Sequence, residues 1–140
     1  MAGYGTYKRL NDAEKRFVWS HPFAAMTFSE DANKALTTAQ SKFPSSELHN
    51  GRGDAFRHCY WNAPMARHEG QELAKEFATA HEESAGQPPE EKAMDLHNNE
   101  VGRDIAAKNP GADDSQLAEL CMQAVLSGRT IVISGPGKNK

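Results

Sequence analysis

Apolar residues recur along this chain at intervals of three and four, the spacing that gathers side chains on one face of an α-helix. The pattern predicts helices over residues 11–20, 30–43, 54–67, 70–83, 90–108 and 114–126. Stretches rich in Gly, Pro, Ser and Asn separate them, as is typical of loops. We expect Pro64 to kink or split its helix, because proline removes one backbone hydrogen bond.

One short run near the C-terminus, RTIVIS at residues 129–134, is typical of a β-strand, and a GPGKNK tail follows it. A chain of 140 residues fits one domain with its own core. The sequence therefore predicts an all-α fold, a single compact domain of about five or six helices with at most one short C-terminal strand. We expect an N-terminal arm at residues 1–10, a helical domain at 11–134 and a flexible tail at 135–140.

The charge of the chain bears on its partners. With 16 basic and 19 acidic residues, the formal net charge is -3. The chain thus lacks the overall positive field with which most nucleic-acid-binding proteins attract phosphates. This favours substrates other than nucleic acid, although a small basic rim would still serve a nuclease.

The sequence also bears on where the chain acts. No apolar run reaches membrane-spanning length, and the first ten residues lack the apolar core of a secretory signal. We therefore expect the chain to be made in the cytoplasm without a signal peptide. We expect its export by a route that needs no cleaved signal, and its action in a target cell.

The chain lacks the standard motifs of several enzyme and ligand-binding classes, and its serines have no convincing His or Asp partner at readable spacing. The chain has no GxSxG, P-loop, HExxH, CxxC or EF-hand pattern. Cys59 and Cys121 lie in apolar helical patterns, so we expect small buried thiols there. Acid/base or metal-assisted hydrolysis is therefore favoured over covalent catalysis.

Polar residues concentrate first at positions 53–62. Asp54 and His58 lie four residues apart and therefore share a helix face. At that spacing the pair can ligate one metal ion, or the carboxylate can orient the imidazole as a base. Arg57 and Asn62 extend the polar face. The structural alternative makes Asp54 the N-cap of its helix and His58 an inert side chain.

A second cluster holds His81 and Glu82. His81 falls on the apolar stripe of its helix, so the alternative to a functional role is that of a buried structural histidine. In a third cluster, Asp95, Asn98 and Asn99 converge on one helix face. Two adjacent asparagines lower the helix propensity of this segment, and the nearby glycine destabilises a helix by about 1 kcal/mol relative to alanine. Such unfavourable residues close together indicate a site. In the alternative, the two asparagines only hydrogen-bond neighbouring loops.

Together the clusters predict one site between three helices, the usual way that helical bundles build such sites. We expect His58, held by Asp54, to be a general base or metal ligand, and His81 or Glu82 the complementary acid or ligand. Asp95 would orient an imidazole or complete a metal shell. The residues expected to bind substrate are Arg57, Asn62, Asn98, Asn99 and Arg103.

The sequence allows both metal-dependent and metal-free chemistry. No pair of ligands has the tight spacing of a dedicated zinc motif, so we expect no tightly bound structural metal. A loosely held divalent cation fits the same residues, and its ligands would then be Asp54, His58, His81 and Asp95.

The string NGRGDAFRHCYWNAPMAR, followed by AHE and then EKAMDLHNNEVGRDIA, resembles a helical domain at the C-termini of bacterial polymorphic toxins. These toxins include Rhs-type and wall-associated proteins, and the domain is largely one of unknown function. The likeness spans about residues 11–107. Its pattern, D-A-x-R-H-x-x-W-N, then H-E, then M-D-x-x-N-N-x-x-G, falls on Asp54, Arg57, His58, Trp61, Asn62, His81, Glu82, Asp95, Asn98, Asn99 and Gly102.

The resemblance implies an antibacterial effector used in interbacterial competition, without defining its reaction. Because no long carrier precedes the domain, the chain is similar to stand-alone effectors of the type VI secretion system. Its implied partners are a cognate immunity protein and a secretion apparatus or carrier protein.

We expect a hydrolase with a His, Asp and Glu site between helices, acting on a lipid or peptidoglycan component of a rival's envelope. One alternative is a metal-dependent nuclease with a basic rim such as Arg52, Arg57 and Arg103. The other is a non-catalytic binding module, such as an immunity or adaptor protein.

Overall fold

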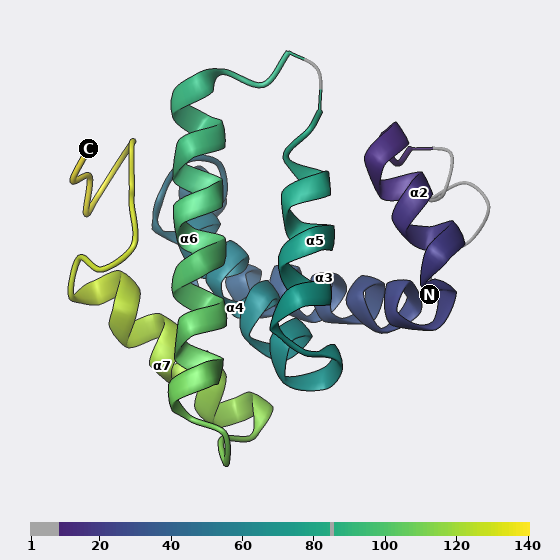
Figure 1. Cartoon of the computed structure of the whole chain (residues 1–140). Coiled ribbons are helices and arrows are strands. Elements are labelled where there is room, and N and C mark those ends of the chain that lie inside the picture. The colour runs from purple at the N-terminus through teal and green to yellow at the C-terminus, as the bar shows by residue number, and fades with distance from the viewer. Residues whose placement is uncertain (1–8, 85) are drawn as a thin grey trace.

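The computed structural model describes residues 9–84 and 86–140 (Figure 1). This part of the chain forms six α-helices and one turn of 3-10 helix, η1, without any β-strand. The elements are α2 (Asp12–Ser20), α3 (Pro22–Lys42), η1 (Ser45–Glu47), α4 (Arg52–Glu69), α5 (Gln71–His81), α6 (Pro89–Lys108) and α7 (Asp114–Leu126). The predicted all-α fold is confirmed. Most of the arm predicted at residues 1–10 lies outside the described residues.

Helix α4 is the centre of the fold and packs against α3, α5, α6 and α7. Between Gly53 and Ala66, every residue except Arg57 is buried. In Figure 1, α5 and α6 stand side by side in front of α4, with α2 and α7 on opposite sides of them. Because other helices cover α4 nearly all round, it has no single apolar stripe, and its polar residues are buried with the rest.

Helices α4 and α6 approach each other closely at Gly102. A Cβ atom added at this position would lie 2.1 Å from the backbone carbonyl oxygen of Cys59 in α4. No side chain fits at that distance, so only glycine allows the two backbones to meet here. The helical glycine that the sequence marks as unfavourable is therefore explained by helix packing.

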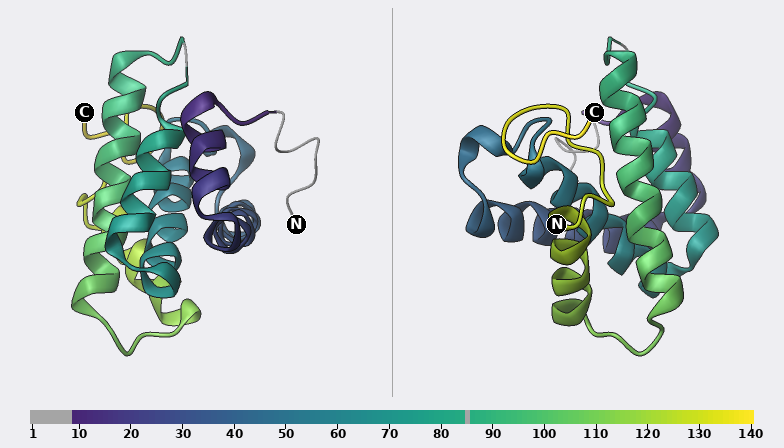
Figure 2. Two further views of the ribbon diagram at one scale, coloured as in Figure 1. Left: turned by 45° about the vertical axis from the view of Figure 1, so that its right-hand side comes forward. Right: turned by 90° about the vertical axis from the view of Figure 1, so that its left-hand side faces the viewer.

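The start of α2 holds the end of α5, and Figure 2 shows the two helices side by side. Asn11 caps α2 in a reciprocal arrangement with Glu14. The Asn11 side chain also donates a hydrogen bond of 2.8 Å to the backbone carbonyl of Ala80. Glu14 in turn lies 2.9 Å from Nδ1 of His81, the last residue of α5. These contacts fix the point where the chain leaves α5.

Three features of the helices differ from the prediction. Helix α3 begins at Pro22 instead of residue 30, because proline suits the first helical turn, where its missing N–H has no partner to lose. Helix α4 begins at Arg52 with Gly51 as its N-cap, so Asp54 is not the capping residue. Pro64 does not split α4, since packing around this buried residue outweighs one missing hydrogen bond.

The C-terminal strand predicted at residues 129–134 does not form. Ile133 and Ser134 donate their backbone N–H groups to the Asn50 carbonyl at 3.1 Å, and no strand lies beside them. Asn139, in the predicted tail, pairs through its backbone and side chain with Val132. Loop and side-chain partners thus satisfy backbone groups that a sheet would otherwise pair.

None of the helices in the described ranges is both long and apolar enough to cross a bilayer.

We predict that Gly102→Ala lowers the free energy of unfolding by about 3 kcal/mol, at the upper end of the range for overpacked cores, because its Cβ meets backbone that cannot rotate away. Gly111→Ala is the matched control, since nothing lies within 4 Å of a Cβ there. Chemical denaturation of both variants measures the difference. Equal stability of the two variants would contradict the close approach of α4 and α6.

Candidate functional site

Two polar stripes face each other where α4 and α6 meet. Residues four apart share a helix face, and each helix has three polar ones in series: Asp54, His58 and Asn62 on α4, and Asp95, Asn99 and Arg103 on α6. All six are buried. They meet in order along the stripes, since His58 faces Asp95, and Asn62 contacts both Asn99 and Arg103.

His58 is held from one side by Asp54. Its Nδ1 atom lies 3.0 Å from the backbone carbonyl of Asp54 and 3.1 Å from the carboxylate Oδ1 of the same residue. Both neighbours are acceptors, so Nδ1 carries the proton and donates it. The other ring nitrogen, Nε2, is thereby turned away from Asp54 and towards the loop after α5.

Two carboxylate oxygens face Nε2 of His58. Oδ1 of Asp95 lies 3.5 Å from it and Oε2 of Glu82 lies 3.8 Å from it. Glu82 is the C-cap residue of α5 and only 2% exposed. Both oxygen atoms are buried, and neither has a hydrogen-bond partner within the described residues. Buried polar atoms are rarely left in this state, so each one calls for an explanation.

Burial and the neighbouring negative charges disfavour the ionised form of Asp95 in this cluster. Burial, opposed by the charge of His58 and reinforced by those of Glu82 and Asp54, raises the pKa of Asp95 to about 6. Burial would lower the pKa of His58, but the hydrogen bond to Asp54 and the charge of Asp95 outweigh it and raise that pKa. The site therefore stabilises positive charge at Nε2.

Asp54 is the most firmly held carboxylate of the cluster. Its Oδ2 accepts the backbone N–H of Asn50 at 2.7 Å, and its Oδ1 lies 2.9 Å from Nη2 of Arg57. Burial would raise its pKa, but the hydrogen bond with His58 and the charges of His58 and Arg57 keep it well below its ordinary value. Asp54 is thus a permanent anion that orients the imidazole.

The cluster is accessible from one side, through a cleft of about 420 Å³. Its rim includes the residues next to α4 and at the start of α6, and the loop between α5 and α6. The lining residues are His49, Asn50, Asp54, Arg57, His58, His81, Glu82, Ser84, Gly86, Gln87, Pro88, Glu91 and Asp95. Every residue predicted to be catalytic therefore lies on this cleft.

His81 stands at the rim, apart from the centre of the cluster. Its Nδ1 is engaged by Glu14, and its ring packs edge-on against Trp61 at 5.4 Å. The side chain is 44% exposed. Of the two residues predicted for the acid or ligand role, Glu82 is the one placed against His58.

The predicted substrate-binding residues separate into two groups. Arg57 lines the cleft, with its side chain one-third exposed. Asn62 and Arg103 instead pair inside the core at 2.8 Å, and Asn99 accepts a hydrogen bond from Asn62. Because these three residues do not line the cleft, we assign them to the helix contact and not to substrate.

Asn98 holds the C-terminal segment. Its side chain donates to the carbonyl of Ile131 at 2.9 Å and accepts the backbone N–H of the same residue at 2.8 Å. The amide thus replaces the neighbouring strand that residues 129–134 lack. Because both of these hydrogen bonds go to Ile131 and Asn98 does not line the cleft, we assign Asn98 to the C-terminal segment and not to the substrate predicted for it.

Sequence reasoning missed two supporting residues. Gln87 donates a hydrogen bond of 3.0 Å to Oδ2 of Asp95, and Asn50 holds both Asp54 and Glu91. Both lie in loops, where no helical spacing relates them to the cluster. Only the folded chain reveals these contacts.

The donor atoms of the cluster also fit a metal ion. Asp54, His58 and Asp95 each offer one ligand atom within 4.8 Å of the others. His81, predicted as a fourth ligand, is engaged elsewhere, and Glu82 stands in its place.

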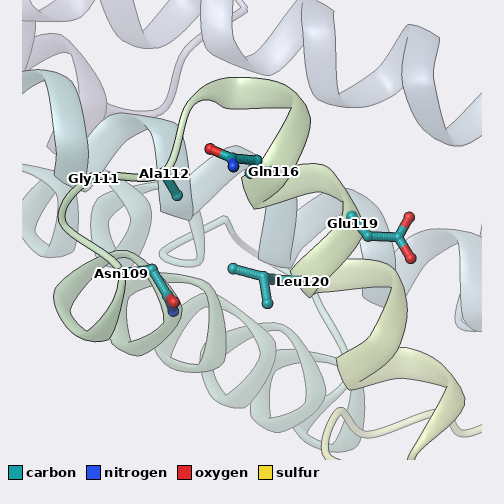
Figure 3. Close-up of a pocket in the computed structure, with 6 residues that line it drawn as sticks. All are labelled: Asn109, Gly111, Ala112, Gln116, Glu119 and Leu120. Atoms are coloured by element: carbon teal, nitrogen blue, oxygen red, sulfur yellow. The ribbon is translucent and has the colours of Figure 1, made fainter.

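A second pocket, of about 460 Å³, lies where α6 turns into α7 (Figure 3). Its lining is Asn109, Gly111, Ala112, Gln116, Glu119 and Leu120. The only titratable side chain there is that of Glu119, which Figure 3 shows on the surface of α7. It has none of the buried, unpartnered groups of the cleft, so the cleft is the better candidate.

Comparison with known protein families identifies the family of the chain but not its activity. A family model described as a domain of unknown function, DUF6973, matches residues 15–129. The match covers most of the chain and all of the polar cluster, so the chain belongs to the DUF6973 family. No solved structure matches the chain at a significant level. The resemblance is thus confirmed as far as a domain of unknown function.

We predict that Asp95→Asn makes the chelator-treated protein more stable at pH 7, by about 1–2 kcal/mol. The raised pKa of Asp95 means that its buried charge opposes folding at neutral pH, and the substitution removes that charge. Glu100→Gln, at an exposed position of the same helix, is the control and should change stability by less than about 0.5 kcal/mol. A less stable Asp95→Asn variant would show that the carboxylate is an ordinary structural ion-pair partner.

Proposed function

We propose that this chain is a hydrolase, and that its reaction takes place at the cleft-facing side of His58. The observation that carries the proposal is the pair of buried, unpartnered oxygens of Glu82 and Asp95, both facing Nε2 of His58. Most buried polar atoms of structural networks have partners, whereas active sites retain unpartnered ones because their chemistry uses them.

The geometry supports activation of a water molecule. A water that enters the cleft reaches the point shared by His58, Glu82 and Asp95. Its oxygen bonds to the electrophilic atom of the substrate while the scissile bond breaks. One water proton passes to the cluster, and the leaving group takes a proton from the cluster as it departs. The cluster is regenerated without any further reactant.

The charge around the cleft supports a substrate that is not a polyanion. Glu82, Asp95 and Glu91 line it against the one guanidinium of Arg57. Such a lining repels the phosphates of a nucleic acid in the absence of bound cations. Its volume suits one small group, such as a sugar, a peptide unit or a lipid headgroup.

Within that range, we propose a cell-envelope component, lipid or peptidoglycan, as the substrate, and a rival bacterium as the target. The support is the resemblance of the motif residues to domains that end bacterial polymorphic toxins. An immunity protein and a secretion apparatus or carrier are the partners that such an effector requires.

We predict that the chain kills cells when it is directed to the periplasm and leaves them viable in the cytoplasm. His58→Gln should abolish killing, because loss of a catalytic imidazole commonly slows a reaction by about 100-fold or more. Counting surviving colonies after induction in each compartment measures both effects. Purified protein should release products from peptidoglycan or phospholipid vesicles in parallel.

His97→Gln is the matched control, since His97 lies on the exposed side of α6, where its Nε2 is 3.0 Å from the backbone carbonyl oxygen of Arg129. This variant should kill as the parent does. Killing from the cytoplasm alone would overturn the envelope target in favour of a nuclease. Absence of killing and of hydrolysis would favour the non-catalytic binding module.

A further inference from the structure

We infer that the cleft binds one exchangeable divalent transition-metal cation through Nε2 of His58, Oε2 of Glu82 and Oδ1 of Asp95. The inference deepens the proposed hydrolase, and its catalytic part rests on that proposal. Its first support is that all three atoms bear lone pairs and are buried, and that both carboxylate oxygens face Nε2 of His58. With Nδ1 holding the ring proton, a divalent cation placed between them would satisfy all three at once.

The distances agree with a shared ion. Two ligand atoms at about 2.1 Å from a metal and about 110° apart are separated by about 3.4 Å. Nε2 of His58 lies 3.5 Å from the Asp95 oxygen and 3.8 Å from the Glu82 oxygen. Glu82 is outside the set of residues whose ligand atoms all lie within 4.8 Å of one another, which is Asp54, His58 and Asp95, so a shared ion requires the Glu82 side chain to move closer.

The charges agree as well. A metal-bound His58 is neutral. Of the charged groups around it in the described part of the chain, Asp54, Glu82 and Asp95 are anions, and Arg57 is a cation that pairs with Asp54. The sum of these formal charges, -2, is the charge that one divalent ion neutralises. A buried excess of that size is otherwise expensive.

Asp54 completes the arrangement from behind. Histidine ligands usually donate their second ring N–H to a carboxylate, which fixes the ring and strengthens the metal bond. Asp54 makes this contact at 3.1 Å and is itself held by Asn50 and Arg57. Asp54 is therefore a positioning residue and not a ligand, and Glu82 replaces both it and His81 in the predicted set.

The donor types favour one class of ion. Ca²⁺ and Mg²⁺ prefer oxygen ligands alone, whereas an imidazole beside two carboxylates suits Zn²⁺ or Mn²⁺. Three protein ligands leave a position open towards the cleft, as in catalytic sites. A cation there lowers the pKa of a bound water and so supplies the nucleophile for hydrolysis.

The test is calorimetric titration of the chelator-treated full chain with ZnCl₂, MnCl₂ and MgCl₂. We expect one Zn²⁺ or Mn²⁺ per chain and weak or absent Mg²⁺ binding. Glu82→Gln and Asp95→Asn should lose the site, and Asp54→Asn should weaken it by about 10- to 100-fold, as loss of a partner behind a ligand does. Glu83→Gln, an exposed neighbour of Glu82, should bind like the parent.

Thermal unfolding with and without ZnCl₂ shows whether each variant is folded, so a lost site is separated from a lost fold. Absence of binding, or full binding by Glu82→Gln and Asp95→Asn, would overturn the inference. A chelated protein that stays fully active while His58→Gln is inactive would refute the cation but keep the hydrolase. Cation binding by a protein that hydrolyses no substrate would keep the cation site but refute the hydrolase.

Discussion

The close approach of α4 and α6 at Gly102 is the constraint on which the rest of the structure depends. With the Cys59 carbonyl where a Cβ would otherwise be, the two backbones meet without side chains between them. Polar residues spaced by four on each helix are thereby forced together inside the core. Where they can pair, as Asn62 does with Arg103, they join the helices. Beside His58 they cannot pair in this way, and the same packing places the carboxylates of Glu82 and Asp95 close to each other's charge.

That difference divides one polar seam into a structural part and a functional part. The inner part is joined by amide and guanidinium hydrogen bonds, although Nδ2 of Asn99 is buried there without a partner among the described residues. The outer part opens to the cleft and leaves oxygens of Glu82 and Asp95 without partners. Proteins rarely retain such atoms for stability, because satisfying them or removing their charge is easy. Their persistence in an otherwise well-packed core therefore points to binding and chemistry.

Sequence alone predicted the helices and most of the cluster, because spacing by four is visible along a helix. It brought Asp54, His58, Glu82 and Asp95 into one hypothesis. It predicted that Asn98 binds substrate and did not anticipate that Asn98 hydrogen-bonds Ile131, because the need of residues 129–134 for a partner depends on the absence of a neighbouring strand. It missed Gln87, which lies in a loop without periodicity. It predicted His81 as a ligand, because the contact between His81 and Glu14 joins helices far apart in the sequence and cannot be seen from spacing.

The central claim is that His58, Glu82 and Asp95 form one centre that holds a cation in the cleft. Anomalous diffraction from crystals soaked in ZnCl₂ tests it most directly. The account predicts a single strong peak at bonding distance, about 2.0–2.2 Å, from Nε2 of His58 and from one oxygen of each carboxylate. A map without that peak, in which the two oxygens share a proton or bind only ordered water, would contradict it.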